Sequence, residues 1–450
     1  MIFPLSLATY KRADLPRVRF SNVFAETAQT VASKVILLPR PGLSSRSTVG
    51  TGPVRGMFYQ PGALDSKLFA VSGGRLFAGT VDTGAIDGDA NVQMAAADTA
   101  LLITNGMKLY RLIGATLSAI AFPDDAGVSS VVYLGGYAVA ARKGSRRFYF
   151  TLDSATWDGL DYLSAEQSTD PIVGLCVVVD QLWVFCERHT EIFFLTGDAD
   201  APFQRVQGRL FDKGALSRDA IVKMDNTVFW VGSDSIVYRG ENTPLRVSDH
   251  GIEERIALSD ASSVLAWSFT WRGHLFYVLQ LATETLLFDA STQLWAEASS
   301  YGLPRWRARF GLQVGREIVA GDDVSGQLWT LTEGLYRDGT DIVRAEWTLL
   351  LNDAAFVDNL LFDMSVGAQA DPNSAAGLLE IRTSRDGGRT WSEWRQTELG
   401  RQGAYRTGPG FNRLGLIDRS GMVVHCRLTD DVPRRLSNAR VNDMAAGRSR

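Results

Sequence analysis

The sequence has few of the residues that build metal sites, disulfides or catalytic centres. Its 450 residues include only three cysteines and four histidines, which are Cys176, Cys186 and Cys426, and His189, His250, His274 and His425. Three cysteines are too few for a disulfide scaffold, and no Cys-x-x-Cys pair exists to hold zinc. The His-Glu-x-x-His, Gly-x-Ser-x-Gly and phosphate-binding-loop motifs are also missing. We therefore predict that the protein holds no cofactor or metal and that these groups carry out no catalysis.

Long hydrophobic runs are missing as well. No apolar stretch approaches the ~20 residues that a membrane-spanning helix needs. The first ten residues are apolar, but they are too few and have no basic residues before them, so they do not predict a signal peptide. We expect synthesis in the cytoplasm and no membrane insertion.

Positive charge is scarce in the middle of the chain and abundant at its ends. Residues 1–55 carry a net charge of +6, and residues 382–450 carry +7, with 14 arginines and no lysine. Because the whole chain has a charge of −4, residues 56–381 carry −17. This split is either ordinary drift of charge along a chain or the mark of an Arg-rich docking surface formed by the two ends. On the second interpretation, Arg40, Pro41, Arg434 and Arg435 are the candidate docking residues.

Short apolar runs of four to eight residues, closed by Gly, Asn or Asp, fill residues 56–335 and predict strands. They form seven similar units that begin near residues 67, 100, 131, 172, 220, 264 and 317. Gly73–Gly74 and Asn105–Gly106 are predicted two-residue hairpin turns. Meandering strands repeated at this interval predict an all-β fold, a β-propeller of six or seven blades. A pair of β-sandwiches is the structural alternative.

The last part of the chain is less regular and predicts a second domain. Strand-like segments lie at 343–366, 378–391 and 415–428, with a small-residue loop at 368–377 and a polar tail at 434–450. We expect three parts: an N-terminal arm at 1–55, the propeller at 56–335, and a C-terminal β domain with its tail at 336–450. The arm is expected to join the C-terminal segment in one small β domain.

The most distinctive short motif is the segment 384–391, which matches the Asp-box pattern S-x-D-x-G-x-T-W through Ser384, Asp386, Gly388 and Trp391. This pattern predicts a turn, because an aspartate can accept hydrogen bonds from nearby backbone N–H groups and glycine tolerates positive φ. We expect Trp391 to fill the core beside it. The box resembles that of sialidases, where it is structural, so one copy is weak support for glycosidase activity.

Carbohydrate chemistry remains an alternative function. The acidic pairs Glu253–Glu254 and Asp322–Asp323 would suit general acid and base catalysis, although acids beside turns more often solvate loops. Tryptophans in the predicted blades would suit a sugar-binding surface, although blade cores use aromatic residues at the same positions; they are Trp230, Trp267, Trp271, Trp295, Trp306 and Trp329. The alternative is therefore a carbohydrate-binding or glycoside-hydrolysing propeller of sialidase type.

Several segments resemble one known family in the order in which that family has them. Near the N-terminus these are 19–26, RFSNVFAE, and 37–43, LLPRPGL. The central ones are 157–161, WDGLD, followed by 165–166, 170–173, 182–186, 190–191, 196–197 and 202–203, and the last is 427–435, RLTDDVPRR. The chain resembles the packaged-DNA stabilisation proteins, the tail hub or nozzle proteins of P22-like short-tailed bacteriophages. Phe24, Cys186 and Asp431 stand where that family has Tyr, Gly and Pro.

The resemblance implies a structural virion protein with no catalysis. Family members form a ring, usually of six copies, below the portal and the head-to-tail adaptor, where it extends the DNA channel, helps to retain packaged DNA and conducts it during ejection. The implied partners are further copies of the chain, the adaptor, and needle, spike or fibre proteins. Double-stranded DNA would pass without sequence-specific binding, along a wall kept from sticking by the acidic body of the chain. A third interpretation, direct binding of nucleic acid by the basic ends, predicts steeply salt-dependent affinity.

Overall fold

The computed structural model describes residues 18–27, 35–166, 169–352, 356–367, 376–405, 408–417 and 421–442. Most of the predicted loop at 368–377 and the end of the predicted tail lie outside these residues. The chain divides into two compact units. The propeller unit comprises residues 45–282 and 307–330, and the terminal unit comprises the described parts of 1–44, 283–306 and 331–450.

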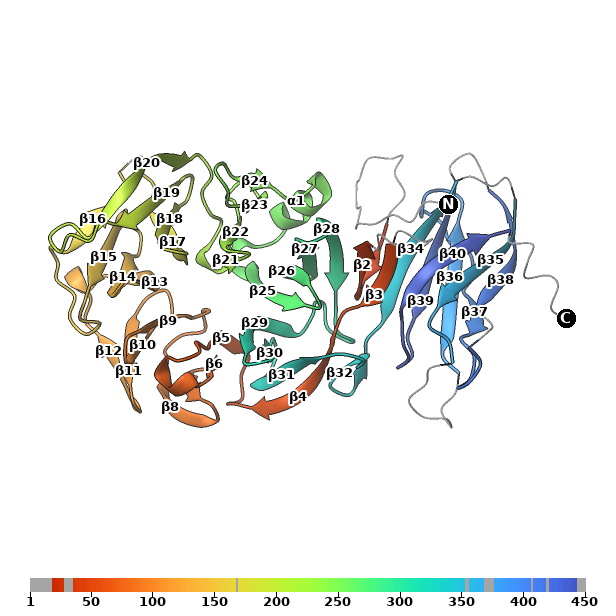
Figure 1. Ribbon diagram of the computed structural model, residues 1–450, viewed down its shortest axis with the longest axis horizontal. Coiled ribbons are helices and arrows are strands. Elements are labelled where there is room, and N and C mark those ends of the chain that lie inside the picture. The colour runs from red at the N-terminus through yellow and green to blue at the C-terminus, as the bar shows by residue number, and fades with distance from the viewer. Residues whose placement is uncertain are drawn as a thin grey trace. The chain divides into compact units, whose positions relative to one another are not determined.

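The propeller unit consists of sheets arranged in a ring (Figure 1). Five of them, among the described residues, are antiparallel four-stranded sheets in chain order, which are the first five blades. They are β5 (Val54–Phe58), β6 (Phe69–Ser72), β7 (Arg75–Ala78) and β8 (Val81–Ala85); β9 (Gln93–Ala97), β10 (Ala100–Thr104), β11 (Leu109–Ile113) and β12 (Thr116–Ile120); β13 (Val128–Leu134), β14 (Tyr137–Arg142), β15 (Arg147–Thr151) and β16 (Tyr162–Ser164); β17 (Ile172–Val178), β18 (Gln181–Cys186), β19 (Thr190–Leu195) and β20 (Phe203–Phe211); and β21 (Ile221–Met224), β22 (Thr227–Val231), β23 (Val237–Arg239) and β24 (Leu245–Arg246).

Two further sheets complete the ring. The sixth blade begins with the hairpin β25 (Leu265–Trp271) and β26 (His274–Gln280), and the seventh contains β29 (Ala308–Val314), β30 (Glu317–Asp322) and β31 (Gln327–Thr332). The innermost strands β5, β9, β13, β17, β21, β25 and β29 each contact the next, and β29 contacts β5. The structure thus confirms the propeller, and it has seven blades among the described residues.

The N-terminal segment closes the ring. Strand β4 (Gly42–Thr48) is the neighbour of β31 in the seventh sheet. The Gln327 amide donates hydrogen bonds to Ser45 Oγ and Ser47 O, both at 3.0 Å, and Thr48 Oγ1 donates to Gln327 Oε1 at 2.9 Å. Residues 45–55 therefore belong to the propeller unit rather than to a separate arm.

Neighbouring blades are held together by apolar side chains between them. Between the third and fourth blades, Phe148 packs edge-on against Phe193 with ring centroids 5.1 Å apart, and both are buried. Between the fourth and fifth, Trp230 meets Phe185 at 5.3 Å. Trp230, Trp267 and Trp329 are buried and belong to blade cores, where an aromatic ring removes a large area from water, whereas Trp271 is only half-buried.

Local structure departs from the sequence prediction in two places. The loop between β10 and β11 has four residues rather than two, because Asn105 Oδ1 accepts from the backbone N–H groups of Met107 and Lys108 and so forms an Asx turn. A short helix, α1 (His250–Ala257), interrupts the strands and is capped by Asp249, whose side chain accepts from Ile252 N. Four 3₁₀ turns occur at Leu64–Ser66, Pro123–Asp125, Arg218–Ala220 and Ala261–Ser263.

The propeller axis is crossed by polar side chains at one end of the inner strands. Arg218, which precedes β21, donates to Asn91 O at 2.7 Å and to Ser129 O at 2.8 Å. Arg309 in β29 donates to Asn91 Oδ1 at 2.8 Å and pairs with Asp323 at 3.1 Å. Side chains and backbone from the second, third, fifth and seventh blades are thus bonded to one another at the centre of the ring.

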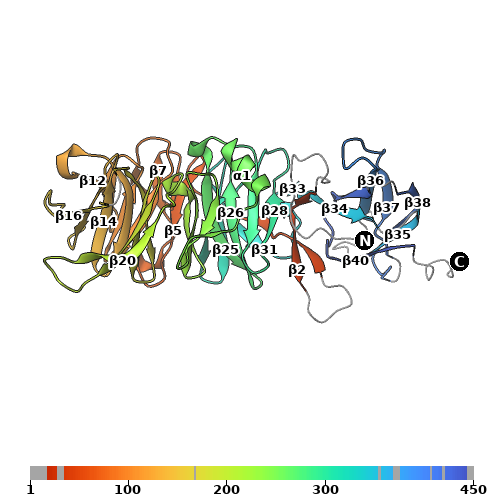
Figure 2. The same cartoon turned by 90° about the horizontal axis from the view of Figure 1, so that it is seen from above.

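The terminal unit contains two sheets, whose C-terminal strands are drawn in blue (Figures 1 and 2). One is part of a nine-stranded sheet, and its strands in this unit have the order β27 (Thr285–Asp289), β28 (Leu294–Ala298), β1 (Phe20–Ser21), β34 (Ala345–Leu351), β39 (Met422–Leu428), β36 (Leu378–Ser384) and β37 (Arg395–Glu398). The other has the order β2 (Val23–Thr27), β3 (Val35–Pro39), β40 (Leu436–Val441), β35 (Phe356–Met364) and β38 (Gly410–Leu416). The short strands β32 (Arg337–Asp338) and β33 (Asp341–Ile342) form a small hairpin.

Both ends of the chain contribute strands to this unit, so N- and C-terminal segments share a small β domain as the sequence predicts. The hairpin β27–β28 from residues 283–306 also belongs to it, which the predicted boundaries at 55 and 335 did not anticipate. Counted by unit, the propeller carries a net charge of −6 and the terminal unit +2. The charge split along the chain is therefore much weaker between the folded units.

Candidate interaction site

Arg40 and Pro41 are buried, which corrects their prediction as docking residues. The side chains of Arg40 and Asp338 are each 1% exposed and form a two-pronged ion pair, Nη1 to Oδ1 at 3.0 Å and Nη2 to Oδ2 at 2.7 Å. Arg40 Nε also donates to Asn22 Oδ1, and Ser300 Oγ donates to the Asp338 carboxylate. Arg40 therefore ties together three distant segments of the terminal unit.

Arg434 is also buried, at 2% exposure, so it too is wrong as a docking residue. Its guanidinium donates to the carbonyls of Val343 and Asp430 and lies over the ring of Tyr336, 5.3 Å from the centroid. Burial lowers the pKa of Arg434 to about 10. The neighbouring Arg435 is exposed, and of the predicted docking residues it alone stays a candidate.

The Asp-box forms the tight turn between β36 and β37. The Asp386 carboxylate accepts from the backbone N–H groups of Arg389 and Thr390, both at 2.9 Å, and from the hydroxyls of Thr390 and Ser384. These bonds hold the pKa of Asp386 well below its usual range. Gly388 has a φ of 94°, and its backbone N–H donates to Ser384 Oγ. Contrary to expectation, Trp391 is only half-buried.

Trp391 instead belongs to a ladder of alternating arginines and tryptophans. Arg427 lies 3.9 Å from the ring centroid of Trp394, and Arg382 lies between Trp394 and Trp391 at 4.7 and 4.6 Å. Such cation–π contacts stabilise a surface without burying it fully. The signal was the repeated tryptophan in 391–394, WSEW, but the two arginines come from other strands and could not be found by spacing.

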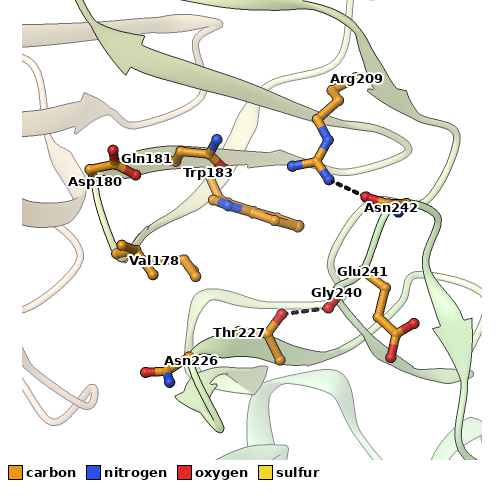
Figure 3. A pocket seen from close by; sticks show the side chains of 11 residues that line it. Val178, Asp180, Gln181, Trp183, Arg209, Asn226, Thr227, Gly240, Glu241 and Asn242 are labelled. Atoms are coloured by element: carbon orange, nitrogen blue, oxygen red, sulfur yellow. Dashed lines mark hydrogen bonds between the residues drawn. The ribbon is translucent and has the colours of Figure 1, made fainter.

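A pocket of about 490 Å³ lies at the turns of the fourth and fifth blades (Figure 3). Trp183 forms its wall, and Arg209 donates to Asn242 Oδ1 at 2.9 Å beside it. Asp180 and Glu241 supply carboxylates from two different turns. The eleven lining residues include no histidine, cysteine or lysine, so Asp180 and Glu241 are the lining groups that could act as acid or base.

Three of the four acids predicted as catalytic candidates form ion pairs with arginines. Glu253 pairs with Arg246 at 2.7 Å, and Asp322 and Asp323 pair with Arg307 and Arg309. Among the described residues, no group of three or more histidine, cysteine, aspartate or glutamate side chains is placed to hold a metal ion. No helix in the described part of the chain is long and apolar enough to cross a membrane.

By its fold the chain is a seven-bladed β-propeller joined to a small two-sheet β domain. Residues 6–335 match the family model described as bacteriophage P22 Gp10, β-propeller, and the chain belongs to that family. A curated relative, tail hub protein gp10 of Salmonella phage P22, is 24% identical over 323 residues, which are 66% of this chain and 66% of the relative.

Solved structures resemble the chain at lower sequence identity. The Neurospora crassa Pan2 WD40 domain is 10% identical, with a TM-score of 0.43, and the match covers 65% of this chain and 97% of that one. Kluyveromyces lactis Hsv2 is 12% identical, with a TM-score of 0.35, covering 62% and 97%.

Proposed function

We propose that this chain is a structural subunit of a phage tail hub. Six copies form a ring below the portal and adaptor, extend the DNA channel, help to retain packaged DNA and conduct it at ejection. The observation that carries the proposal is the family match over residues 6–335, which includes the whole propeller. We propose no catalytic role, since the acidic pairs singled out in the sequence form ion pairs or flank them.

The propeller axis supports a channel between copies rather than through one. Arg218 and Arg309 both donate hydrogen bonds to Asn91 from other blades, so polar side chains occupy the axis of the propeller. A ring of copies would therefore enclose the DNA among its members. The propeller unit carries −6 per copy, so six copies would total −36, a charge that repels a sliding duplex.

An antibody against this chain, applied to purified phage particles from the source culture, tests the proposal. Gold label at the tail on the portal axis in negative stain is the expected result, together with the chain among the denatured particle proteins. Particles that carry neither label nor chain would overturn the structural role. The propeller would then be screened for glycan binding and hydrolysis.

A further inference from the structure

One loop of the propeller unit exposes leucines among aspartates. The loop between β15 and β16, residues 152–161, is LDSATWDGLD and has no lysine or arginine. Leu152 is 69% exposed and Leu160 is 83% exposed. Exposed apolar side chains rimmed by polar groups can form an interaction site when they lie together, and these two leucines stand at the two ends of one loop. We call residues 152–161 the acidic loop.

The acidic loop is held in place by its other residues. Trp157 is buried and packs against Phe122 with ring centroids 5.4 Å apart. Ser154 is also buried and accepts a hydrogen bond from Arg111 Nε at 2.9 Å. The backbone is further fixed by Asp153, which accepts from Ala155 N. A loop anchored in this way presents its leucines at little cost in conformational entropy, as a docking element should.

The terminal unit carries a patch in which arginines outnumber acids, with Asp358 of β35 as an exposed carboxylate beside it. Phe356 and Leu416 are 47% and 62% exposed, and they are paired residues at the end of β35 and β38. A bulge follows on β38, where Arg413 has a φ of 57° and is exposed, with no ion pair or hydrogen bond among the described residues.

Two more arginines gather at the same bulge. Arg395 donates to Asn412 O at 2.7 Å and Arg385 donates to Leu414 O at 3.3 Å, so their guanidiniums flank Arg413 along the strand. Asp386, the acid adjacent in sequence to Arg385, accepts its hydrogen bonds within the Asp-box turn. We call Phe356, Leu416, Arg385, Arg395 and Arg413 the basic patch.

The acidic loop and the basic patch match in chemistry. One has two leucines and the carboxylates of Asp153, Asp158 and Asp161, and the other has two apolar side chains and three guanidiniums. We propose that the acidic loop of one copy docks on the basic patch of the next copy. A contact between two different surfaces of one chain is head-to-tail and closes into a ring when the rotation allows. The inference rests on the ring proposed above and names the contact that builds it.

Variants with reversed charges test the contact. Each variant replaces the wild-type chain completely in the phage, and the assembled particles are then counted. We expect Asp158→Arg with Asp161→Arg, and separately Arg385→Asp with Arg413→Asp, to reduce tailed particles at least tenfold in negative stain. The chain with all four changes carries both exchanges, so it is expected to recover at least half of the tailed particles. Asp200→Arg, an exposed change in another propeller loop, is the control and is expected to have no effect.

The outcomes separate this contact from the ring itself. Thermal unfolding of each purified variant, followed by circular dichroism, must match the wild type, so that lost assembly is not lost folding. Normal tail assembly by either pair of exchanges would overturn the contact while leaving the ring in place. Assembly lost in all three exchanged variants would also overturn it. Wild-type particles that contain the chain but show no ring of copies would overturn the ring proposal instead.

Discussion

At the scale of single residues, the buried Arg40–Asp338 pair is expected to matter for stability rather than for docking. Arg40→Ala leaves the Asp338 carboxylate buried without its partner, which costs about 3–5 kcal/mol. Arg435→Ala, the exposed control, is expected to change the free energy of unfolding by less than about 0.5 kcal/mol. Urea denaturation of both variants measures the difference, and equal effects would contradict this reading of the two arginines.

The lowered pKa of the Asp322 carboxylate is expected to make the stability of the protein fall at acid pH. Burial alone would raise the pKa of Asp322, but hydrogen bonds from Arg307, Ser325 and Trp329 outweigh it and lower the pKa. A lowered folded-state pKa contributes stability above the unfolded value of about 3.9, and this contribution is lost as pH falls below it.

Asp322→Asn is therefore expected to be less stable than the wild type at pH 7 and to lose less stability on acidification below about pH 4. Urea denaturation at several pH values between 7 and 3 measures both slopes. Asp200→Asn, exposed and distant, serves as the control. Parallel pH curves for Asp322→Asn and the wild type would exclude the proposed linkage.

At the scale of elements, the polar crossing at the propeller axis is expected to hold the inner strands together. Arg218→Met removes charged hydrogen bonds to Asn91 O and Ser129 O and is expected to cost about 3 kcal/mol. Arg218→Lys keeps the charge, but a single ammonium cannot replace the two-pronged guanidinium, so an intermediate loss is expected. Guanidinium denaturation compares the three proteins, and a change in the Met variant below about 0.5 kcal/mol would show that the crossing is dispensable.

Sequence patterns predicted the strands well because each strand carries its own signal. Alternation and Gly-rich turns predicted seven units, and the two-residue turn at Gly73–Gly74 is present between β6 and β7. The four-residue loop at Asn105 was missed because the Asn105 side chain replaces the backbone hydrogen bonds that a shorter turn would make. The pairing of β1 with β28 and β34 carries no local signal, since its partners lie about 280 to 330 residues away.

At the scale of the whole molecule, the boundaries of the propeller can be tested with fragments. Residues 56–335 lack β4, the strand that closes the seventh blade, whereas residues 42–335 contain it. We expect the longer fragment to have the higher Tm and to resist protease longer, because Ser45, Ser47 and Thr48 bond to Gln327 only when β4 is present. Equal Tm values would show that β4 does not contribute to closure.

The all-β fold, the seven repeated units, the sharing of one domain by both chain ends and the family could all be predicted from the sequence, because they rest on periodicity and on short motifs within the chain. Only the tertiary structure decided which arginines are accessible. Arg40 and Arg434 look like surface cations in the sequence, and their partners Asp338 and Val343 are 298 and 91 residues away. Burial depends on such distant contacts. The proposed docking surface therefore lies at the bulge of β38, where Arg413 is exposed, and not at Arg40 or Arg434.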